Sequence, residues 1–343
     1  MDLTTDLDEH VRRIIAVQFN PHTGAPYWLE RQRELGMNAT KDIQTFDDLK
    51  LLGDMEEEAL ARRPVLDFVP LSERNRLEGA VITETGGTTG SPKRTIFSRN
   101  EFHAAFVEPF VRMAEHVGFP RDGAWLYAGP SGPHVIGQAA GACATAWGGH
   151  QPFAIDFDPR WFRTLPAESI GRDRYIQHLL EQAMRILRAE PIVVIFTTPV
   201  MLERLATVMT VPERERVRGV HYGGMVVEPA LLQHAQRMWF PNAVHLAGYG
   251  NSLFGVCMEC GGNAARPLRY YPHGLRHQVR VAEDGAVWMH RLDRTVLIAN
   301  MKERDVGVPA LASAPLCSLG FGEGVEGPRP HRQHSEPLRI GIY

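Results

Sequence analysis

TGGTTGSPK, at residues 85–93, combines three glycines, four hydroxyl side chains and one lysine within nine residues. Glycines let the backbone adopt positive φ and bring N–H groups close to an anion. The hydroxyl groups add hydrogen-bond donors, and Lys93 adds a positive charge. The stretch therefore predicts a loop that binds phosphate groups. The alternative is a plain hairpin turn that happens to be rich in glycine and threonine.

A Walker A loop requires lysine directly after its second glycine, followed by serine or threonine. Here Ser91 and Pro92 separate Gly90 from Lys93, so the sequence does not fit that loop. It instead resembles the signature (S/T)-(S/G)-G-(S/T)-T-G-x-P-K of the adenylate-forming superfamily of acyl-CoA synthetases, peptide-synthetase adenylation domains and luciferases. The resemblance implies catalytic roles for Thr88, Thr89 and Lys93, and binding of the β- and γ-phosphates of ATP by Thr85, Gly86, Gly87 and Gly90.

Other stretches resemble motifs of this superfamily and occur in the expected order. GPSGPHVIGQAAG, at 129–141, resembles the segment that borders the acyl pocket, which makes His134 a candidate catalytic residue. FTTPVMLERL, at 196–205, resembles the strand, proline and helix that precede the adenine site. HYGGMVVEP, at 221–229, resembles the adenine-contacting turn, and this resemblance implies nucleotide binding by Gly223, Gly224 and Met225.

AGYGNSLFG, at 247–255, is similar to the YGxTE segment, in which the aromatic ring flanks adenine and the Thr and Glu serve phosphate and magnesium. The resemblance implies nucleotide binding by Tyr249, Gly250 and Asn251, and contact of Ser252 with the α-phosphate. KERDVG, at 302–307, places Asp305 where the superfamily keeps an aspartate on the ribose hydroxyls. A carboxylate that accepts two hydroxyl hydrogen bonds suits that position.

Short apolar runs alternate with helical segments, and this alternation predicts an α/β fold. Residues 8–80 carry helical patterns, and YWLERQRELGMNATKDIQTFDDLKLL, at 27–52, resembles the opening of the phenylacetate-CoA ligase branch. A further helix is expected from Ser98 to about residue 119. The runs AWLYAGP, QPFAIDF, PIVVIFTTP and GVHYGGMVV predict a buried, largely parallel sheet.

From about Val244 the runs RHQVRVAED, GAVWMHRL and TVLIANM predict a small antiparallel layer, and the Gly- and Pro-rich run at 320–337 predicts loops. We therefore expect a helical lead-in at 1–80, an α/β nucleotide- and acyl-binding core at 81–243, and an adenine and ribose segment with a β-rich subdomain at 244–343. With the resemblance, these parts are expected to form the multi-subdomain N-terminal core of an adenylate-forming enzyme, with mixed, largely parallel sheets.

Two departures from the superfamily's pattern bear on mechanism. Leu253 occupies the position of the acidic residue that serves magnesium, and leucine cannot ligate a hard cation. Glu259 or Glu228 could take over, nucleotide and water could hold the metal, or the activity could be impaired. The ending PLRIGIY resembles a remnant of the hinge, so the small C-terminal lid domain and its lysine are expected to be absent. A partner protein or a homodimer contact could supply that lid.

Cys257 and Cys260 form a C-x-x-C pair, and thiolates with imidazole suit tetrahedral zinc. Some members of the phenylacetate-CoA ligase-like branch carry a structural zinc near these places. The resemblance implies a zinc site made by Cys257, Cys260, Cys317 and either His273 or His277. The alternatives are that these cysteines are small core residues, as Cys143 is expected to be, or that Cys317 forms a thioester.

Bulk properties limit the function classes. The net charge is −3 and Lys and Arg are scattered, which does not fit a dedicated nucleic-acid binder. Four cysteines are too few for a disulfide scaffold in 343 residues. No run approaches the roughly 20 apolar residues of a membrane span, and the acidic start lacks a secretory signal, so we expect no membrane partner and a cytoplasmic location.

The resemblance implies an AMP-forming ligase that uses ATP and Mg²⁺. It would convert a small carboxylic acid of the aryl or amino acid type to an acyl-adenylate with release of pyrophosphate, for transfer to CoA, a carrier-protein thiol or an amine. One alternative is a nucleotide-binding or scaffold relative without turnover. Another is a short enzyme similar to the acyl-protein synthetases of bioluminescent bacteria, which pass the acyl group to a cysteine.

Overall fold

The computed structural model describes residues 3–86, 91–260 and 267–331, which fall into two compact units. Unit 1 comprises Met1–Ala105, Asn251–Gly255 and Pro272–Val325. Unit 2 comprises Phe106–Gly250, Val256–Tyr271 and Glu326–Tyr343. Each unit is assembled from separate stretches of chain. The division into three parts at residues 80 and 243, expected from the sequence, stays a prediction.

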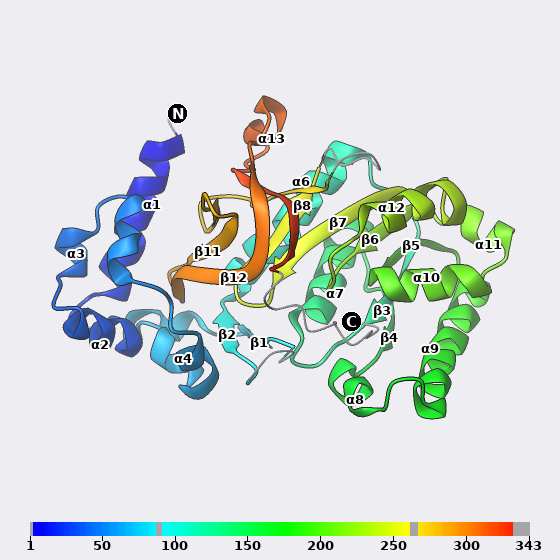
Figure 1. The fold of residues 1–343 in the computed structure, drawn as a ribbon, viewed down its shortest axis with the longest axis horizontal. Helices are drawn as coiled ribbons and strands as arrows, with labels where there is room; N and C mark the ends of the chain where they lie inside the picture. Colours follow the sequence, from blue (N-terminus) through cyan, green and yellow to red (C-terminus); the bar gives the residue numbers. More distant parts are fainter. Residues whose placement is uncertain (1–2, 87–90, 261–266, 332–343) are drawn as a thin grey trace. The chain divides into compact units, whose positions relative to one another are not determined.

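The N-terminal part of unit 1 is helical, as expected (Figure 1). Its elements are α1 (Leu3–Gln18), α2 (Pro26–Glu34), α3 (Ala39–Asp42), η1 (Asp47–Leu52), α4 (Glu57–Arg62), η2 (Val65–Phe68) and η3 (Leu71–Arg76). Val11, Ile14 and Ile15 of α1 are buried at helical spacing. The indole N–H of Trp28 on α2 donates to the carbonyl of Leu297 at 3.1 Å, which ties the lead-in to a distant part of the same unit.

A two-stranded sheet and three antiparallel strands of the 11-stranded sheet complete unit 1. The strands β1 (Val81–Glu84) and β2 (Arg94–Phe97) form a hairpin in which Glu84 is opposite Arg94. The three strands of the larger sheet are β10 (His277–Val281), β11 (Ala286–Leu292) and β12 (Leu297–Ala310), which pair antiparallel in that order, and α13 (Ala314–Ser318) follows them. These three strands confirm the antiparallel layer that the sequence predicted near the C-terminal end.

Unit 2 contains the predicted parallel sheet. Its strand order is β13 (Gly324–Pro330), β9 (Arg269–Tyr271), β8 (Gly255–Glu259), β7 (Val244–Asn251), β6 (Gly219–Tyr222), β5 (Ile192–Thr197), β3 (Ala124–Gly129) and β4 (Phe153–Asp156). The pairs from β7 through β4 are parallel, and β8 pairs antiparallel with β9. Strands β3 and β6 are buried along their whole length, as expected for strands covered on both faces.

Helices connect these parallel strands, and α7 and α9 both pack against β3 (Figure 1). The helical elements of unit 2 are α6 (Glu108–Val117), α7 (Val135–Gly148), α8 (Pro159–Thr164), α9 (Ile170–Ala189), α10 (Pro199–Val208), α11 (Val211–Glu215), α12 (Pro229–His234) and η5 (Ala235–Trp239). The alternation of strand and helix therefore confirms the α/β class that the sequence pattern predicted.

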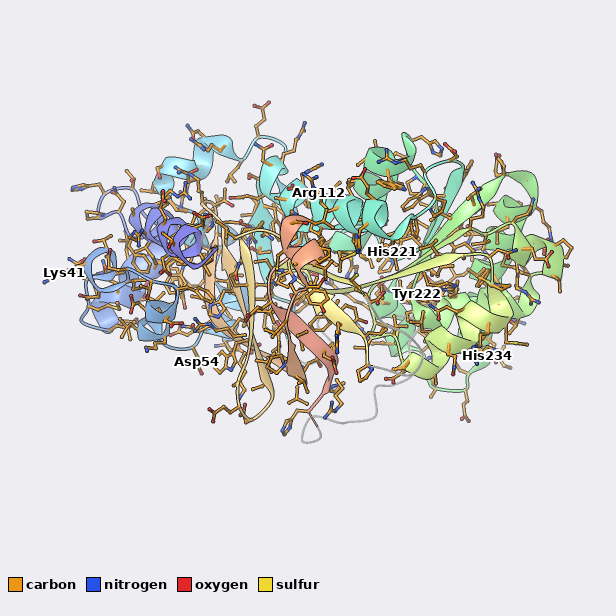
Figure 2. The ribbon with its side chains drawn as sticks, turned by 90° about the horizontal axis from the view of Figure 1, so that it is seen from above. Lys41, Asp54, Arg112, His221, Tyr222 and His234 are labelled. Atoms are coloured by element: carbon orange, nitrogen blue, oxygen red, sulfur yellow. The ribbon has the colours of Figure 1, made fainter. Side chains whose placement is uncertain are left out.

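Strand β6 places His221 and Tyr222 in the interior of unit 2 (Figure 2). Burial lowers the pKa of His221 to about 4, so the ring is neutral, and its Nδ1 lies 2.9 Å from the carbonyl of Leu246 on β7. The Tyr222 hydroxyl lies 2.7 Å from Nδ1 of His245. These contacts fix the strand end from which the paired glycines Gly223 and Gly224 follow.

The helix predicted from Ser98 to residue 119 starts where expected but is not continuous. Ser98 and Glu101 form a capping box at the start of α5 (Arg99–Phe102). A single wider turn, η4 (His103–Val107), then precedes α6. Pro109 explains the break, because proline has no N–H to donate to the carbonyl one turn earlier.

The loops predicted at 320–337 are partly wrong, because Gly324–Pro330 is strand β13. The backbone N–H of Gly327 donates to the carbonyl of Leu268 at 2.8 Å. Glycine and proline disfavour strands locally, so this strand depends on pairing with a distant segment, which a local pattern does not reveal. The run PLRIGIY lies outside the described residues. Over the described ranges, no helix is both long enough and apolar enough to cross a lipid bilayer.

Candidate functional site

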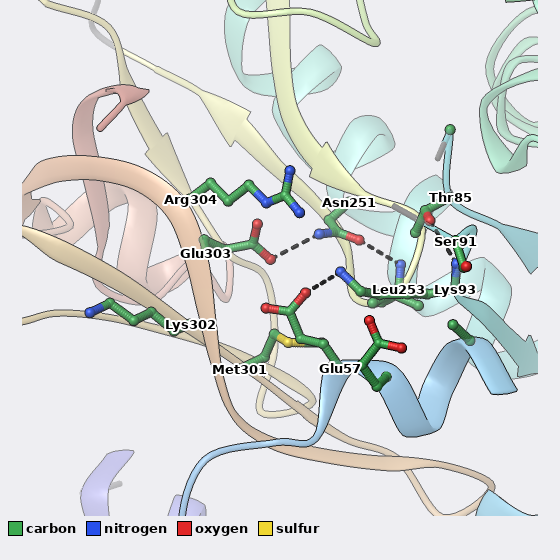
Figure 3. Close-up of a pocket in the computed structure, with 13 residues that line it drawn as sticks. Glu57, Thr85, Ser91, Lys93, Asn251, Leu253, Met301, Lys302, Glu303 and Arg304 are labelled. Carbon is green, nitrogen blue, oxygen red and sulfur yellow. Dashed lines mark hydrogen bonds and ion pairs between the residues drawn. The ribbon is translucent and has the colours of Figure 1, made fainter. Parts of the chain in front are cut away.

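A pocket of about 220 Å³ lies within unit 1 (Figure 3). It is lined by Glu57, Glu58 and Ala61 of α4, by Thr85, Gly86, Ser91 and Lys93, by Asn251 and Leu253, and by Met301, Lys302, Glu303 and Arg304 of β12. The pocket therefore joins the two ends of the glycine-rich stretch to the segment that resembles YGxTE. Four parts of the chain that are far apart in sequence meet there.

The β1–β2 hairpin fixes the two ends of the glycine-rich stretch. The backbone N–H of Thr85 donates to the carbonyl of Lys93 at 2.9 Å. In return, the backbone N–H of Lys93 donates to the side-chain oxygen of Thr85 at 2.9 Å. The stretch is thus the connection of a hairpin, and its two ends open into the pocket. Gly87, Thr88, Thr89 and Gly90 lie outside the described residues.

The ammonium group of Lys93 forms an ion pair with the carboxylate of Glu57. Glu57 is the first residue of α4, so its carboxylate also lies at the positive end of that short helix. The side chains of Lys93 and Glu57 are 21% and 39% exposed, which leaves both within reach of solvent and of a bound anion. A phosphate group that binds Lys93 must therefore compete with Glu57.

Asn251 has a fixed side-chain orientation in the pocket. Its Oδ1 accepts a hydrogen bond from the backbone N–H of Leu253 at 2.9 Å, and its Nδ2 donates to Oε1 of Glu303 at 2.8 Å (Figure 3). The amide thus links the 251–255 segment to β12. The side chain of Leu253 is 1% exposed and brings no oxygen atom to the pocket.

Glu303 is the most perturbed carboxylate of the pocket. Burial raises its pKa to about 7, and the nearby negative charges of Asp305 and Glu57 add to the rise. Lys93 and the hydrogen bond from Asn251 act in the opposite direction. A carboxyl group that is close to half-ionised at neutral pH and adjoins a lysine is typical of functional sites, although structural networks also produce such shifts.

Two predicted site residues adjoin the pocket without lining it. Asp305 follows Glu303 by two positions on β12. Its charge acts on Glu303, as the raised pKa of Glu303 reflects. Ser252 contributes its carbonyl to a hydrogen bond from the hydroxyl of Thr83 at 2.9 Å.

The sequence reasoning missed Glu57 and Glu303. It named Glu259 and Glu228 as substitutes for the absent magnesium carboxylate, and both of those residues lie in unit 2. Glu303 could have been found from its place two residues before Asp305, since it is the other carboxylate of the run KERDVG. Glu57 gave no local signal, because only the tertiary fold brings α4 to Lys93.

Unit 2 holds the remaining nucleotide-binding candidates: Gly223, Gly224, Met225, Tyr249 and Gly250. Gly224 has φ of +79°, which favours glycine, and a Cβ on Gly223 would lie 2.8 Å from Cδ1 of Ile136. The ring of Tyr249 packs against Tyr270 with centroids 5.6 Å apart. His134, the acyl-pocket candidate, also lies in unit 2, where it is buried directly before α7. The functional roles of these residues stay predictions.

The zinc site expected at Cys257, Cys260, His273 and Cys317 is not supported. Within the described ranges, no group of three or more His, Cys, Asp or Glu side chains is arranged to hold a metal ion. Cys257 lies on β8, and Cys260 extends the pairing of that strand with a backbone hydrogen bond to Arg269. Cys257 is buried, whereas Cys260 follows the last residue of the strand and is half-buried.

The zinc candidates instead have the contacts of core and structural residues. Burial raises the pKa of Cys257, as expected for a core thiol. In unit 1, Nε2 of His273 lies 3.1 Å from the carbonyl of Leu319, and the ring packs edge-on against Phe321. The thiol of Cys317 lies 3.7 Å from the carbonyl of Ala312. His277, the alternative ligand, is buried on β10 and stacks on Phe254.

Comparison with known proteins identifies the fold. No protein-family profile matches the sequence, and no curated protein matches it. Among solved structures, 2-hydroxyisobutyryl-CoA ligase in its postadenylation state with 2-HIB-AMP matches with a TM-score of 0.60 and 12% identity, covering 96% of this chain and 68% of that one. The same ligase in its thioesterification state with 2-HIB-AMP and CoA gives a TM-score of 0.59 and 14% identity, with 95% and 67% covered. This protein therefore has the fold of the N-terminal part of the adenylate-forming ligases, over about two thirds of such a chain.

Proposed function

We propose that this protein activates a small carboxylic acid with ATP and forms an acyl-adenylate. The observation that carries the proposal is the unit 1 pocket, in which Lys93 and both ends of the glycine-rich stretch meet Asn251 and Glu303. An ammonium group and backbone N–H groups suit phosphate, and a carboxylate beside them suits the cation that accompanies phosphate. The shared fold with a ligase whose structures hold an acyl-adenylate supports the same reaction.

In the proposed reaction, a carboxylate oxygen of the acid attacks the α-phosphorus of ATP. The bond from that phosphorus to the oxygen bridging the β-phosphate breaks, and pyrophosphate leaves. Residues 85–93 hold the β- and γ-phosphates, and Lys93 exchanges Glu57 for phosphate oxygens. Because the leaving group carries the developing charge, a fixed cation there lowers the barrier. Ser252 contacts the α-phosphate in this scheme.

The residues of the pocket also fit a magnesium ion. Mg²⁺ prefers oxygen ligands and is commonly held by one or two carboxylates together with the phosphates of the substrate. Asn251 bonds to Oε1 of Glu303, so the second carboxylate oxygen, Oε2, can take the place of the acidic residue that Leu253 displaces. When bound, Mg²⁺ supplies charge neutralisation for the phosphate oxygens. The chain's own task is to present Glu303 at a fixed place, which Asn251 does.

Other groups complete the proposal. Asp305 accepts the ribose hydroxyls, Gly223, Gly224 and Tyr249 bind the adenine, and His134 borders the acyl group. CoA, a carrier-protein thiol or an amine then takes the acyl group. The ligase of similar fold has been captured with CoA, which favours a thiol acceptor. The relation to the phenylacetate-CoA ligase branch and the expected dependence on a partner or homodimer contact stay predictions.

A nucleotide-binding relative without turnover is the second candidate. The ion pair of Lys93 with Glu57 favours it, because a lysine held by a carboxylate is not available to the phosphates until that pair opens. This candidate predicts ATP binding without acid-dependent chemistry.

Isotope exchange between ATP and labelled pyrophosphate, with a panel of aryl and amino acids, tests the proposal. Acid-dependent exchange is expected, and Lys93→Ala should lower its rate roughly 100- to 1,000-fold, as removal of a charge-stabilising donor does elsewhere. Lys41→Ala is the control, because Lys41 is an exposed lysine on α3 (Figure 2). ATP binding by calorimetry without exchange for any acid would favour the second candidate, and no nucleotide binding would sink both.

A further inference from the structure

The pocket segment Asn251–Gly255 is held by side chains through three successive carbonyls. The carbonyl of Ser252 accepts from the Thr83 hydroxyl at 2.9 Å. The carbonyl of Leu253 accepts from Nη1 of Arg291 at 3.2 Å, and that of Phe254 accepts from Nη1 of Arg276 at 2.7 Å. Buried carbonyls outside a regular ladder need such partners. The backbone that carries Asn251 and Leu253 therefore depends on these three donors for its position.

Two of these donors, Thr83 and Arg291, also connect to the hairpin that carries the glycine-rich stretch. Thr83 belongs to β1 and precedes Thr85 by two residues. Arg291, on β11, donates from Nη1 to the hydroxyl of Thr95 at 2.9 Å and from Nη2 to the carbonyl of Ile96 at 2.8 Å. Thr95 and Ile96 belong to β2 and follow Lys93 closely. Both strands of the hairpin are thus joined to the 251–254 backbone, one by Thr83 and the other by Arg291.

Arg291 is suited to this bridging role by its planar, five-donor head. It is 0% exposed, and its guanidinium carbon lies 3.6 Å from the centroid of the Phe97 ring. Asp293 balances its charge, since Oδ2 accepts from Nε of Arg291 at 2.6 Å. Asp293 also accepts two bonds from Arg276, at 2.9 Å and 2.7 Å. A lysine has one small cationic head and cannot reach these partners at once.

A buried ionic network of this kind adds little net stability compared with well-packed apolar side chains, because removing charges from water is costly. The network instead fixes the positions of the groups it binds, because each hydrogen bond specifies where its acceptor must lie. The acceptors here are the two strands beside Lys93 and the backbone beside Asn251. These are the two walls between which the triphosphate is proposed to bind.

We propose that Thr83 and Arg291 are positioning residues for nucleotide: they hold the backbone of 251–254 at a fixed separation from the hairpin that carries residues 85–93. This inference rests on the proposed function, in which the unit 1 pocket binds the triphosphate of ATP. Neither residue lines the pocket, and both act through the residues that do. Loss of either side chain should weaken nucleotide binding by more than the accompanying loss of stability of unit 1 explains.

Thr83→Val tests the proposal because valine has the shape of threonine without the hydroxyl, and Thr83 is 0% exposed. The dissociation constant of ATP with Mg²⁺, measured by calorimetry, should rise roughly 3- to 10-fold, as expected when one buried hydrogen bond no longer fixes a binding segment. In the exchange assay, KM for ATP should rise with kcat less affected. Thr83→Ser, which keeps the hydroxyl, should restore both values.

Thr295→Val is the matched control. Thr295 is a 2% exposed threonine of the same unit, and its hydroxyl bonds to Glu101 instead of the pocket segment. Both valine variants should lower the melting temperature, but only Thr83→Val should weaken ATP binding. Arg291→Lys should weaken ATP binding further. If that variant does not fold, the comparison of Thr83→Val with Thr295→Val still tests the proposal.

Equal ATP affinity in Thr83→Val and Thr295→Val would overturn the proposal and leave the network a purely structural one. Failure of the proposed function would be visible separately, because the unmodified protein would then either not bind ATP or bind it without acid-dependent exchange. A loss of affinity in Thr83→Val that Thr83→Ser does not restore would also contradict the inference.

Discussion

The ion pair between Lys93 and Glu57 predicts that Glu57→Gln binds ATP more tightly. The substitution keeps the size of the side chain but removes the charge that competes with phosphate for the ammonium group. The two side chains are 21% and 39% exposed, so solvent weakens their attraction. Exposed or partly exposed pairs are worth about 0.2–1 kcal/mol. If ATP no longer has to open this pair, the dissociation constant should fall by roughly 1.4- to 5-fold.

Calorimetric titration of ATP with Mg²⁺ at low ionic strength measures this effect, because added salt screens such partly exposed charges. Glu58→Gln is the matched control: Glu58 lines the same pocket on the same helix, but its carboxylate pairs with Arg62 at 3.0 Å. Equal gains in both variants would mean that net charge alone matters. A weaker affinity in Glu57→Gln would refute the reasoning, since Glu57 would then bind the nucleotide–metal complex and not compete with it. In the background of Lys93→Met, the Glu57 substitution should bring no gain.

Further predictions concern the pocket carboxylate, the leucine beside it and the thiols. Glu303 has a pKa near 7 against an ordinary value of 4.5, so between these pH values the folded state binds more protons than the unfolded state. The free energy of unfolding of the metal-free protein should therefore fall as pH rises from about 4.5 to 7, by at most about 3 kcal/mol from this group, and then level off. Urea unfolding should show a smaller difference in the free energy of unfolding between pH 5 and pH 8 for Glu303→Gln than for the parent protein. An equal difference in the two proteins would contradict the assigned pKa of Glu303. Leu253→Glu should lower the melting temperature, because the side chain is 1% exposed and a new carboxylate would be buried near Glu303. Added Mg²⁺ should raise the melting temperature of that variant more than that of the parent, and equal responses would argue against a cation at this place. Iodoacetamide should label the half-buried Cys260 and Cys317 before the buried Cys143 and Cys257, whose thiols have raised pKa values, and peptide mass spectrometry that finds the reverse order would contradict the assigned burial.

Local patterns in the sequence were enough to predict much of the fold. The runs of β3, β5 and β6 are mostly apolar, and a continuous apolar run is typical of a strand in a sheet covered on both faces. The capping box at Ser98 marked the start of α5, because it depends on residues only three apart.

The remaining features depend on contacts between distant parts of the chain. Glu57 meets Lys93 only because α4 folds back to the hairpin, and no pattern within α4 reports this. Strand β13 depends on a partner strand despite its unfavourable composition. The spacing of Cys257 and Cys260 suggested a metal site, but among the described residues no third ligand lies with them. Conformation, and not spacing in sequence, decides whether two ligands can meet.

The interleaved make-up of unit 1 has a consequence for synthesis of the chain on the ribosome. The indole of Trp28 bonds to the carbonyl of Leu297, a separation of 269 residues. At roughly 5–20 residues per second, the lead-in waits on the order of 13–54 s before its partner strand emerges. Throughout that interval α1 lacks its contact with β11, and Trp28 of α2 lacks its contact with β12. Because its last stretch, Pro272–Val325, follows most of unit 2 in the chain, unit 1 completes only after most of unit 2 has been made.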